Sequence, residues 1–282
     1  MNKTKIDWAD MTWNPVTGCL NECEYCYARK IAERFGLEYA PKLGDPGMEG
    51  AAKYDTEQEG MDTMLELQRP YVDRDGRRKS YPMAFYPTFH RYKLNEPLKK
   101  KESKTIFVCS MADLFGDWVP DEWIKEIFEA CEKAPQHRYI FLTKNPKRYV
   151  YLCEKGMLPR KNDFWFGSTI TQREEPAWIE GGSDYGIGND CYCHKKFISI
   201  EPILKDFTIK GTISLCRVME LFGWVIIGAE TGNRKNKVIP ERKWIENIAN
   251  ACKEAGTPVF MKNNLSSIWH DKLIQELPWA AI

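Results

Sequence analysis

The sequence lacks any hydrophobic run long enough to cross a membrane. Its longest apolar stretch, residues 221–229, is far shorter than the roughly 18 residues that a spanning helix needs. It also lacks an apolar N-terminal segment, because Asp7, Trp8 and Asp10 stand where the core of a secretory signal would be. We therefore expect a cytoplasmic protein that does not enter a membrane.

Nor does the sequence carry an excess of charge of one sign. Its 41 lysines and arginines nearly match its 40 aspartates and glutamates, so bulk charge indicates no particular partner. Disorder over most of the chain is excluded, since 43% of the residues are hydrophobic. At 282 residues, the chain has the length of one large domain or two small ones.

Short apolar runs alternate with segments of helical periodicity. Alternating strands and helices predict parallel βα units, and about eight such units predict a TIM-like (β/α) barrel, complete or partial. A six-strand partial barrel or an open doubly wound sheet is the alternative. The expected strands are residues 12–16, 83–86, 105–109, 138–142, 164–168, 196–200, 224–228 and 258–261. The expected helices are residues 28–35, 122–133, 146–155 and 241–254.

Two segments interrupt this alternation. Residues 38–80 are long, glycine-rich and charged, and we interpret them as an insertion after the first helix. Residues 181–195 contain glycine and cysteine and precede the sixth expected strand. Neither has the composition of an independent core, so we expect a single domain over residues 1–282.

Polar side chains follow most of the expected strands. In a barrel of parallel strands, the C-terminal ends meet at one rim, where binding and catalytic residues gather. A carboxylate at such a rim can hold hydroxyl or amino groups of a ligand or pair with a lysine, although any one of these residues is also an ordinary turn residue. The rim candidates are Asp113, Lys144, Ser168, Glu201, Glu230 and Lys262.

Three cysteines lie in one short loop between the first expected strand and the first helix. Cys19, Cys23 and Cys26 have the spacing Cys-x3-Cys-x2-Cys. Three thiolates in one loop can bind a compact soft-metal centre. A structural zinc normally needs four ligands, whereas three cysteines on a [4Fe–4S] cluster leave one iron open. Zinc remains the alternative, with a fourth ligand from Cys191, Cys193 or His194.

The other cysteines have simpler interpretations. Ten cysteines in a chain of this composition suggest a reducing compartment, where thiols serve metals or catalysis rather than disulfides. Cys191 and Cys193, together with His194, could also form a second metal site. The scattered cysteines are expected to be small core residues: Cys109, Cys131, Cys153, Cys216 and Cys252.

The cysteine loop, with Tyr25 just before its third cysteine, resembles that of the radical S-adenosylmethionine (SAM) superfamily. Further blocks are similar to an uncharacterised, phage- and bacteria-borne family of radical-SAM-like proteins with no established substrate. The similarity covers nearly the whole chain except residues 38–80 and 181–195. Its blocks are residues 6–8, 12–19, 26–28, 89–94, 106–115, 119–121, 142–146, 199–202, 224–232 and 259–262.

This resemblance implies an enzyme with a [4Fe–4S] cluster on Cys19, Cys23 and Cys26 and SAM as its second cofactor. Reductive cleavage of SAM would release a 5′-deoxyadenosyl radical that acts on the substrate. An electron donor such as flavodoxin or ferredoxin is implied as a partner. Cofactor-binding candidates are Tyr25, Asp113, Ser168, Glu201, Glu230 and Lys262. Substrate-binding candidates are His90, Arg91 and Lys144.

The substrate class depends on a weaker pattern. Lys144 and Lys262 at the rim, with the basic run at residues 233–237, favour an anionic substrate such as a nucleotide or nucleic acid. The alternative function is a non-catalytic, zinc-stabilised protein that binds nucleic acid through its basic stretches. Those stretches are residues 74–79, 99–104 and 234–237.

Overall fold

The computed structural model describes residues 1–36, 48, 51–54, 64–160, 163–171, 195–207 and 214–280. The chain divides into two compact units. The first consists of residues 1–4, 9–139 and 161–163, and the second of residues 5–8, 140–160 and 164–282. Much of the expected insertion at residues 38–80, and residues 181–194, lie outside the described residues.

The largest sheet is mostly parallel, as the alternation of strands and helices predicts. Its strands follow the order β1-β2-β9-β10-β11-β12-β13-β14. β1 is antiparallel to β2, whereas β2 is parallel to β9, and β11, β12, β13 and β14 are parallel to one another. The order rises along the chain without the reversal that defines a doubly wound sheet. Among the described residues it starts at β1 and stops at β14, so a closed TIM barrel is not confirmed. These strands are β1 (Asn2–Lys3), β2 (Met11–Trp13), β9 (Thr105–Val108), β10 (Arg138–Thr143), β11 (Asp163–Ile170), β12 (Lys195–Ile200), β13 (Val225–Ile227) and β14 (Val259–Met261).

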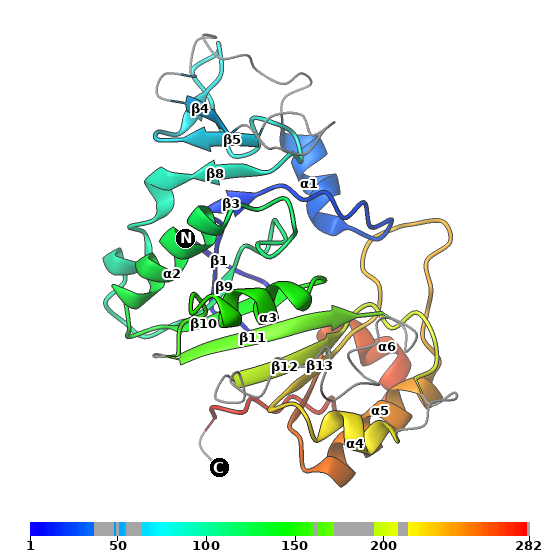
Figure 1. Ribbon diagram of the computed structural model, residues 1–282. Coiled ribbons are helices and arrows are strands. Elements are labelled where there is room, and N and C mark those ends of the chain that lie inside the picture. The colour runs from blue at the N-terminus through cyan, green and yellow to red at the C-terminus, as the bar shows by residue number, and fades with distance from the viewer. Residues whose placement is uncertain are drawn as a thin grey trace. The chain divides into compact units, whose positions relative to one another are not determined.

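The first unit contains a second sheet that the sequence did not indicate. Its four strands are ordered β3-β8-β5-β4, and Figure 1 shows them stacked in that order, with α1 beside them. A small two-stranded ribbon, β6-β7, accompanies it. The strands are β3 (Val16–Thr17), β4 (Ala51–Tyr54), β5 (Met64–Leu67), β6 (Tyr71–Val72), β7 (Arg78–Lys79) and β8 (Thr88–His90).

Two expected strands differ from the observed ones. The run at residues 12–16 is divided between β2 and β3, because Pro15 has no N–H to donate to a sheet. Residues 83–86 form turns rather than a strand, and Ala84 there has a positive φ of 50°. The neighbouring strand is β8, which begins after Pro87 and pairs within the second sheet.

The four expected helices form close to their expected bounds, as α1, α2, α3 and α5, whereas the short helices α4 and α6 were not expected. They are α1 (Tyr27–Phe35), α2 (Asp121–Glu132), α3 (Lys147–Glu154), α4 (Leu215–Met219), α5 (Arg242–Ala255) and α6 (Ser266–Trp269). Among the described residues, the 3-10 helices are η1 (Arg91–Lys93), η2 (Pro97–Lys99) and η4 (Asn263–Leu265). Helix α5 ends at Gly256, whose φ of 66° suits a left-handed cap. No helix in the described ranges has the length and apolar character to span a bilayer.

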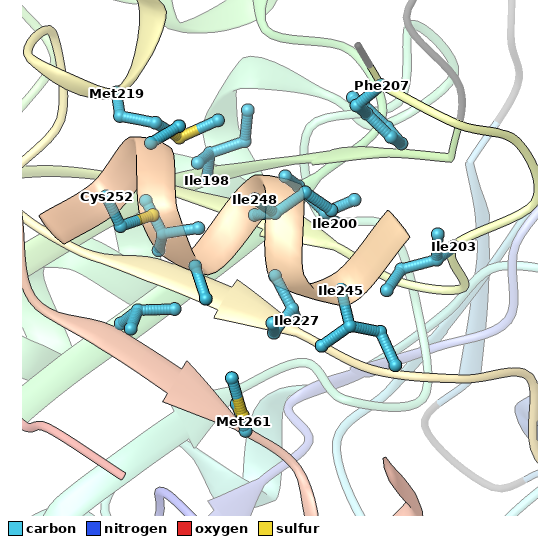
Figure 2. Packing of buried hydrophobic residues seen from close by; sticks show 14 of the residues in the cluster. Ile198, Ile200, Ile203, Phe207, Met219, Ile227, Ile245, Ile248, Cys252 and Met261 are labelled. Atoms are coloured by element: carbon cyan, nitrogen blue, oxygen red, sulfur yellow. The ribbon is translucent and has the colours of Figure 1, made fainter. Parts of the chain in front are cut away.

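The core of the second unit is aliphatic on one face of its sheet. Figure 2 shows Ile245 and Ile248 of α5 close to the side chains of the strands. Ile198, Ile200 and Ile227 come from β12 and β13, and all five isoleucines are 0% exposed. Each such burial contributes roughly 1.5–3 kcal/mol. This packing fixes β12 and β13, and therefore the residues that follow them.

The opposite face of the same strands is aromatic. Trp224 is fully buried, and its ring centroid lies 4.9 Å from that of Trp279 and 5.4 Å from that of Phe197. Trp8 meets Trp224 edge-on at 5.9 Å. Alternation along each strand therefore separates an aliphatic face under α5 from an aromatic face.

Candidate functional site

The cysteine loop is positioned by backbone contacts directly after β3. Gly18 donates its N–H to Met111 O, and Cys19 donates to Phe85 O, both at 2.9 Å. Gly18 has a φ of 93°, and a Cβ there would lie 2.1 Å from Tyr86 O. Only glycine fits both the backbone conformation and this close approach. These contacts therefore fix the direction of the backbone at the start of the loop, and with it the position of Cys19.

Helix α1 begins within the cysteine loop, and a cysteine is its N-cap residue. Cys26 is the N-cap, and its sulfur accepts the N–H of Arg29 at 3.3 Å. The buried residues of the helix are small, Ala28 and Ala32, and Cys19 and Cys26 pack against the same apolar cluster. The large side chains on this helix are instead exposed: Tyr27, Ile31 and Phe35.

All three cysteines are partly buried, and none of them forms a disulfide. The Cys19 sulfur accepts the N–H of Asn21 at 3.4 Å, and the Cys23 thiol donates to Asn21 O at 3.6 Å. Burial raises the pKa of Cys19 to about 12, and nearby negative charge from Asp113, Cys23 and Cys26 adds to this effect. A thiolate at Cys19 therefore needs a nearby positive charge, which a metal centre supplies.

The donor set fits a soft-metal or iron–sulfur centre, but the sulfurs do not yet surround one point. Within the described residues, no three cysteine, histidine or acidic side chains are arranged around a common metal position. Three thiols in one loop, with backbone N–H groups directed at two of the sulfurs, are suitable ligands for an iron–sulfur cluster. Binding of such a centre would therefore require the sulfurs of Cys19, Cys23 and Cys26 to move toward a common point.

Asp113 contacts the cysteine loop through its carboxylate. Its side chain is 5% exposed, and Oδ2 accepts from Asn21 Nδ2 at 3.0 Å while Oδ1 accepts from Phe115 N at 3.2 Å. The structure thus brings this rim candidate to the cysteine loop. Tyr25, between the second and third cysteines, is partly buried.

Asn14 is a site residue that sequence reasoning missed. It follows β2 directly, and its Oδ1 accepts from Met111 N at 3.1 Å and from Ser110 Oγ at 3.2 Å. Tyr27 donates its hydroxyl to Ser110 O at 2.9 Å, which links α1 to the same segment. The sequence signal for Asn14 is its place as a polar residue directly after a strand.

His90 and Arg91, both substrate candidates, are engaged in structural contacts. His90 is fully buried, with Thr17 Oγ1 2.9 Å from Nε2 and Tyr92 OH 3.3 Å from Nδ1. Arg91 forms ion pairs with Glu66 at 3.0 Å and with Glu126. These contacts account for both side chains without a ligand, and substrate binding by either remains a prediction.

The buried histidine predicts a pH dependence of stability. Burial, and then the positive charge of Lys93, hold the pKa of His90 well below 6.5. As the pH falls below about 6.5, His90 becomes protonated in the unfolded chain but stays neutral in the folded chain. The free energy of unfolding therefore decreases. We expect this loss to be up to about 1.4 kcal/mol per pH unit, and His90→Gln to remove it.

Denaturant unfolding between pH 7 and pH 5 measures this slope. His270 is exposed, so His270→Asn is the matched control and should keep the wild-type slope. Parallel pH profiles for the wild type and His90→Gln would show that His90 does not carry the effect.

In the second unit, the strand register brings two rim candidates together. Ile200 pairs with Ile227, and Ile227 pairs with Met261. Glu201 and Lys262 therefore follow their strands at one level, and they form an ion pair. Gly228 lies between them. A Cβ on Gly228 would lie 3.2 Å from Glu201 Cδ and 3.1 Å from Lys262 Cδ, so its missing side chain leaves room for the pair.

Ser168 is not brought to this pair. It lies opposite Ile198, whose side chain belongs to the aliphatic core under α5, whereas Glu201 lies on the alternate face of the sheet. Ser168 is 5% exposed, and its hydroxyl has no hydrogen-bond partner among the described residues. Thr169, paired with Ser199, faces the same side as Glu201.

The remaining rim candidates, Glu230 and Lys144, have different surroundings. Glu230 is 2% exposed and accepts two hydrogen bonds from Arg234 at 2.8 Å, which lower the pKa of its carboxyl. This contact explains both Glu230 and one residue of the basic run at residues 233–237. Lys144 is partly buried after β10.

Several cysteine predictions have mixed outcomes. Cys109, Cys131 and Cys252 are buried and free, in agreement with a core role. Cys216 is only partly buried. Cys153 is disulfide-bonded, which contradicts the expectation that none of the core cysteines forms a disulfide. The candidate second metal site at Cys191, Cys193 and His194 lies outside the described residues.

Solved structures with a similar fold share little sequence with this chain. One is a double mutant of spore photoproduct lyase with bound AdoMet and dinucleoside spore photoproduct, with a TM-score of 0.51 and 10% identity. Another is a single mutant of the same lyase, with a TM-score of 0.50 and 9% identity. Each match covers 92% of this chain and 78% of the other. At these identities, the likeness is one of fold.

Two further comparisons concern the sequence itself. No curated protein matches the chain. The model of a family described as "Protein of unknown function (DUF5131)" matches residues 3–272, which is nearly the whole sequence. The chain therefore belongs to this family of unknown function.

Proposed function

We propose that this protein is a radical SAM enzyme in which Cys19, Cys23 and Cys26 hold a [4Fe–4S] cluster. The observation that carries the proposal is three partly buried thiols, none of them in a disulfide, in one loop at the start of α1. Support for the SAM reading comes from the fold, because a structure of similar fold was solved with bound AdoMet. When bound, the cluster supplies the electron that reductively cleaves SAM to yield a 5′-deoxyadenosyl radical.

The chain's own residues would hold the cluster in three ways. The positive end of α1 at Cys26 favours a negatively charged thiolate. Arg29 anchors the loop by donating to Cys19 O at 3.2 Å, and its guanidinium lies over the Phe85 ring at 5.0 Å. Asp113 holds Asn21 and thereby the chain between the first two ligands. These contacts hold the backbone of the loop that carries the three sulfurs.

Other residues remain candidates for binding SAM and the substrate. Glu201 can accept from ribose hydroxyls or an ammonium group, and Lys262 can pair with a carboxylate. For either to do so, the ligand must compete with the ion pair between them. We further propose an anionic, nucleotide-containing substrate and an electron donor such as flavodoxin or ferredoxin.

Detection of 5′-deoxyadenosine tests the function directly. Protein purified without oxygen should be brown, with a broad absorption band near about 400 nm. Incubation with dithionite and SAM should then release 5′-deoxyadenosine and methionine, slowly even without substrate. A Cys26→Ala variant is the control and should release none. Cluster-containing protein that yields no more 5′-deoxyadenosine than this control would contradict the proposal, and colourless protein with about one zinc would support the zinc-stabilised alternative.

A further inference from the structure

The first unit has a hollow at the N-terminal end of β9 that the proposed function does not use. Its volume is about 740 Å³, and five of its lining residues are lysines, against two carboxylates. We call it the lysine hollow. It is lined by Lys3, Thr4, Ala9, Asp10, Met11, Lys99, Lys100, Lys101, Glu102 and Lys104.

The two carboxylates of the lysine hollow are already engaged. Asp10 Oδ2 accepts the N–H of Thr105 at 2.8 Å, and Glu102 pairs with Lys104 at 2.9 Å. Within the described ranges, no acidic group pairs with any of the other lysines, which are Lys3, Lys99, Lys100 and Lys101. The formal charge of the whole chain is only +1, so this concentration of positive charge is local.

The lysine-bearing loop is held at both ends by one buried side chain. His137 is 1% exposed, and its Nε2 bonds to Pro97 O at 3.0 Å while its Nδ1 accepts from Lys104 N at 3.2 Å. Gln136 donates to Lys100 O at 2.7 Å between these points. The backbone of the three consecutive lysines is therefore fixed before any ligand arrives, which reduces the entropy lost on binding.

The chemistry of the lining selects the kind of anion. Lysine ammonium groups bind phosphates as point charges, without the planar geometry that arginine imposes. No described lining residue is aromatic, so the hollow offers nothing on which an unpaired base could stack. A nucleic acid that presents its phosphates and keeps its bases stacked inside fits this surface. We propose that the lysine hollow binds the phosphate backbone of double-stranded nucleic acid, without reading its sequence.

This proposal does not depend on the iron–sulfur cluster or on SAM, because the hollow contains none of the cysteines. Binding of a labelled DNA duplex can be measured by fluorescence anisotropy from about 50 to 200 mM salt, with the matching single strand and ATP as competitors. The test variant carries Lys99→Gln, Lys100→Gln and Lys101→Gln. The matched control carries Lys243→Gln, Lys253→Gln and Lys272→Gln, which remove the same charge from exposed positions elsewhere.

We expect the duplex to bind most tightly and its affinity to fall steeply with salt. Removing three phosphate contacts should lower the salt slope by up to about 3 and weaken binding at low salt at least about tenfold. The control variant should bind as the wild type does, and both variants should unfold at the wild-type temperature. Equal weakening in both variants, stronger binding of the single strand or of ATP, or no duplex binding at low salt would each overturn the proposal.

Discussion

Replacing any one of Cys19, Cys23 or Cys26 by alanine is expected to remove most of the iron from protein purified without oxygen. The wild type should carry about four irons per chain, the content of one [4Fe–4S] cluster, to which the loop supplies three thiolates. Two remaining thiolates cannot retain a cluster of this kind firmly. Iron analysis and the absorption near about 400 nm measure the loss.

Two controls separate the loss of a ligand from a loss of folding. Cys216→Ala removes a partly buried cysteine from α4 and should leave the iron content unchanged. Cys26→Ser keeps an N-cap acceptor for the N–H of Arg29, so α1 should form normally while the cluster is lost. If any of the three single alanine variants keeps its full iron content, the ligand assignment is wrong.

The second large effect is expected from Gly18→Ala. The new Cβ would meet Tyr86 O at 2.1 Å, and alanine would also have to adopt a φ of 93°. Overpacking against backbone and an unfavourable φ together should lower the free energy of unfolding by about 2–5 kcal/mol. The displaced loop should also bind iron poorly. Denaturant unfolding, combined with iron analysis, measures both consequences.

Gly156→Ala is the matched control for this substitution. Gly156 also has a positive φ, of 67°, but no atom lies within 4 Å of its expected Cβ. It should lose only the conformational part, about 1–2 kcal/mol, and should keep its iron. Equal destabilisation by the two substitutions would mean that the contact with Tyr86 is relieved by a small backbone shift.

The parallel strands and the long helices could be predicted because their signals are local. Helix α5 shows this most clearly, since apolar spacing marks its length and Gly256 marks its end. The second sheet escaped prediction because strands such as β3 and β8 are too short to show a periodic pattern. Their pairing depends on contacts between distant segments, Val16 with Phe89 for example.

The candidate site also combines features that are local in the sequence with features that depend on the fold. The proposed ligands Cys19, Cys23 and Cys26 share a local spacing, so the sequence alone was enough to suggest them. The bond from Asn21 to Asp113 joins residues 92 positions apart, and no local pattern indicates it. Ser168 illustrates a different limit. Its place after an apolar run suggests the rim, but strand register decides which face it occupies, and register is a property of the folded sheet.

Helix α1 buries small side chains and exposes large apolar ones, and this bears on how firmly the helix is held. Burial of Ala28 and Ala32 stabilises this helix far less than the isoleucines of α5 stabilise theirs, and Tyr27, Ile31 and Phe35 remain 45%, 38% and 57% exposed. Elements with so little buried apolar area open locally at a small free-energy cost. The later turns of α1 can therefore open and close while its first turn stays held by the bonds of Tyr27 to Ser110 O and of Arg29 to Cys19 O, and while α5 stays packed. The loop that carries the three sulfurs would keep its backbone during such opening, so cluster binding would not need the whole helix to be formed at every moment.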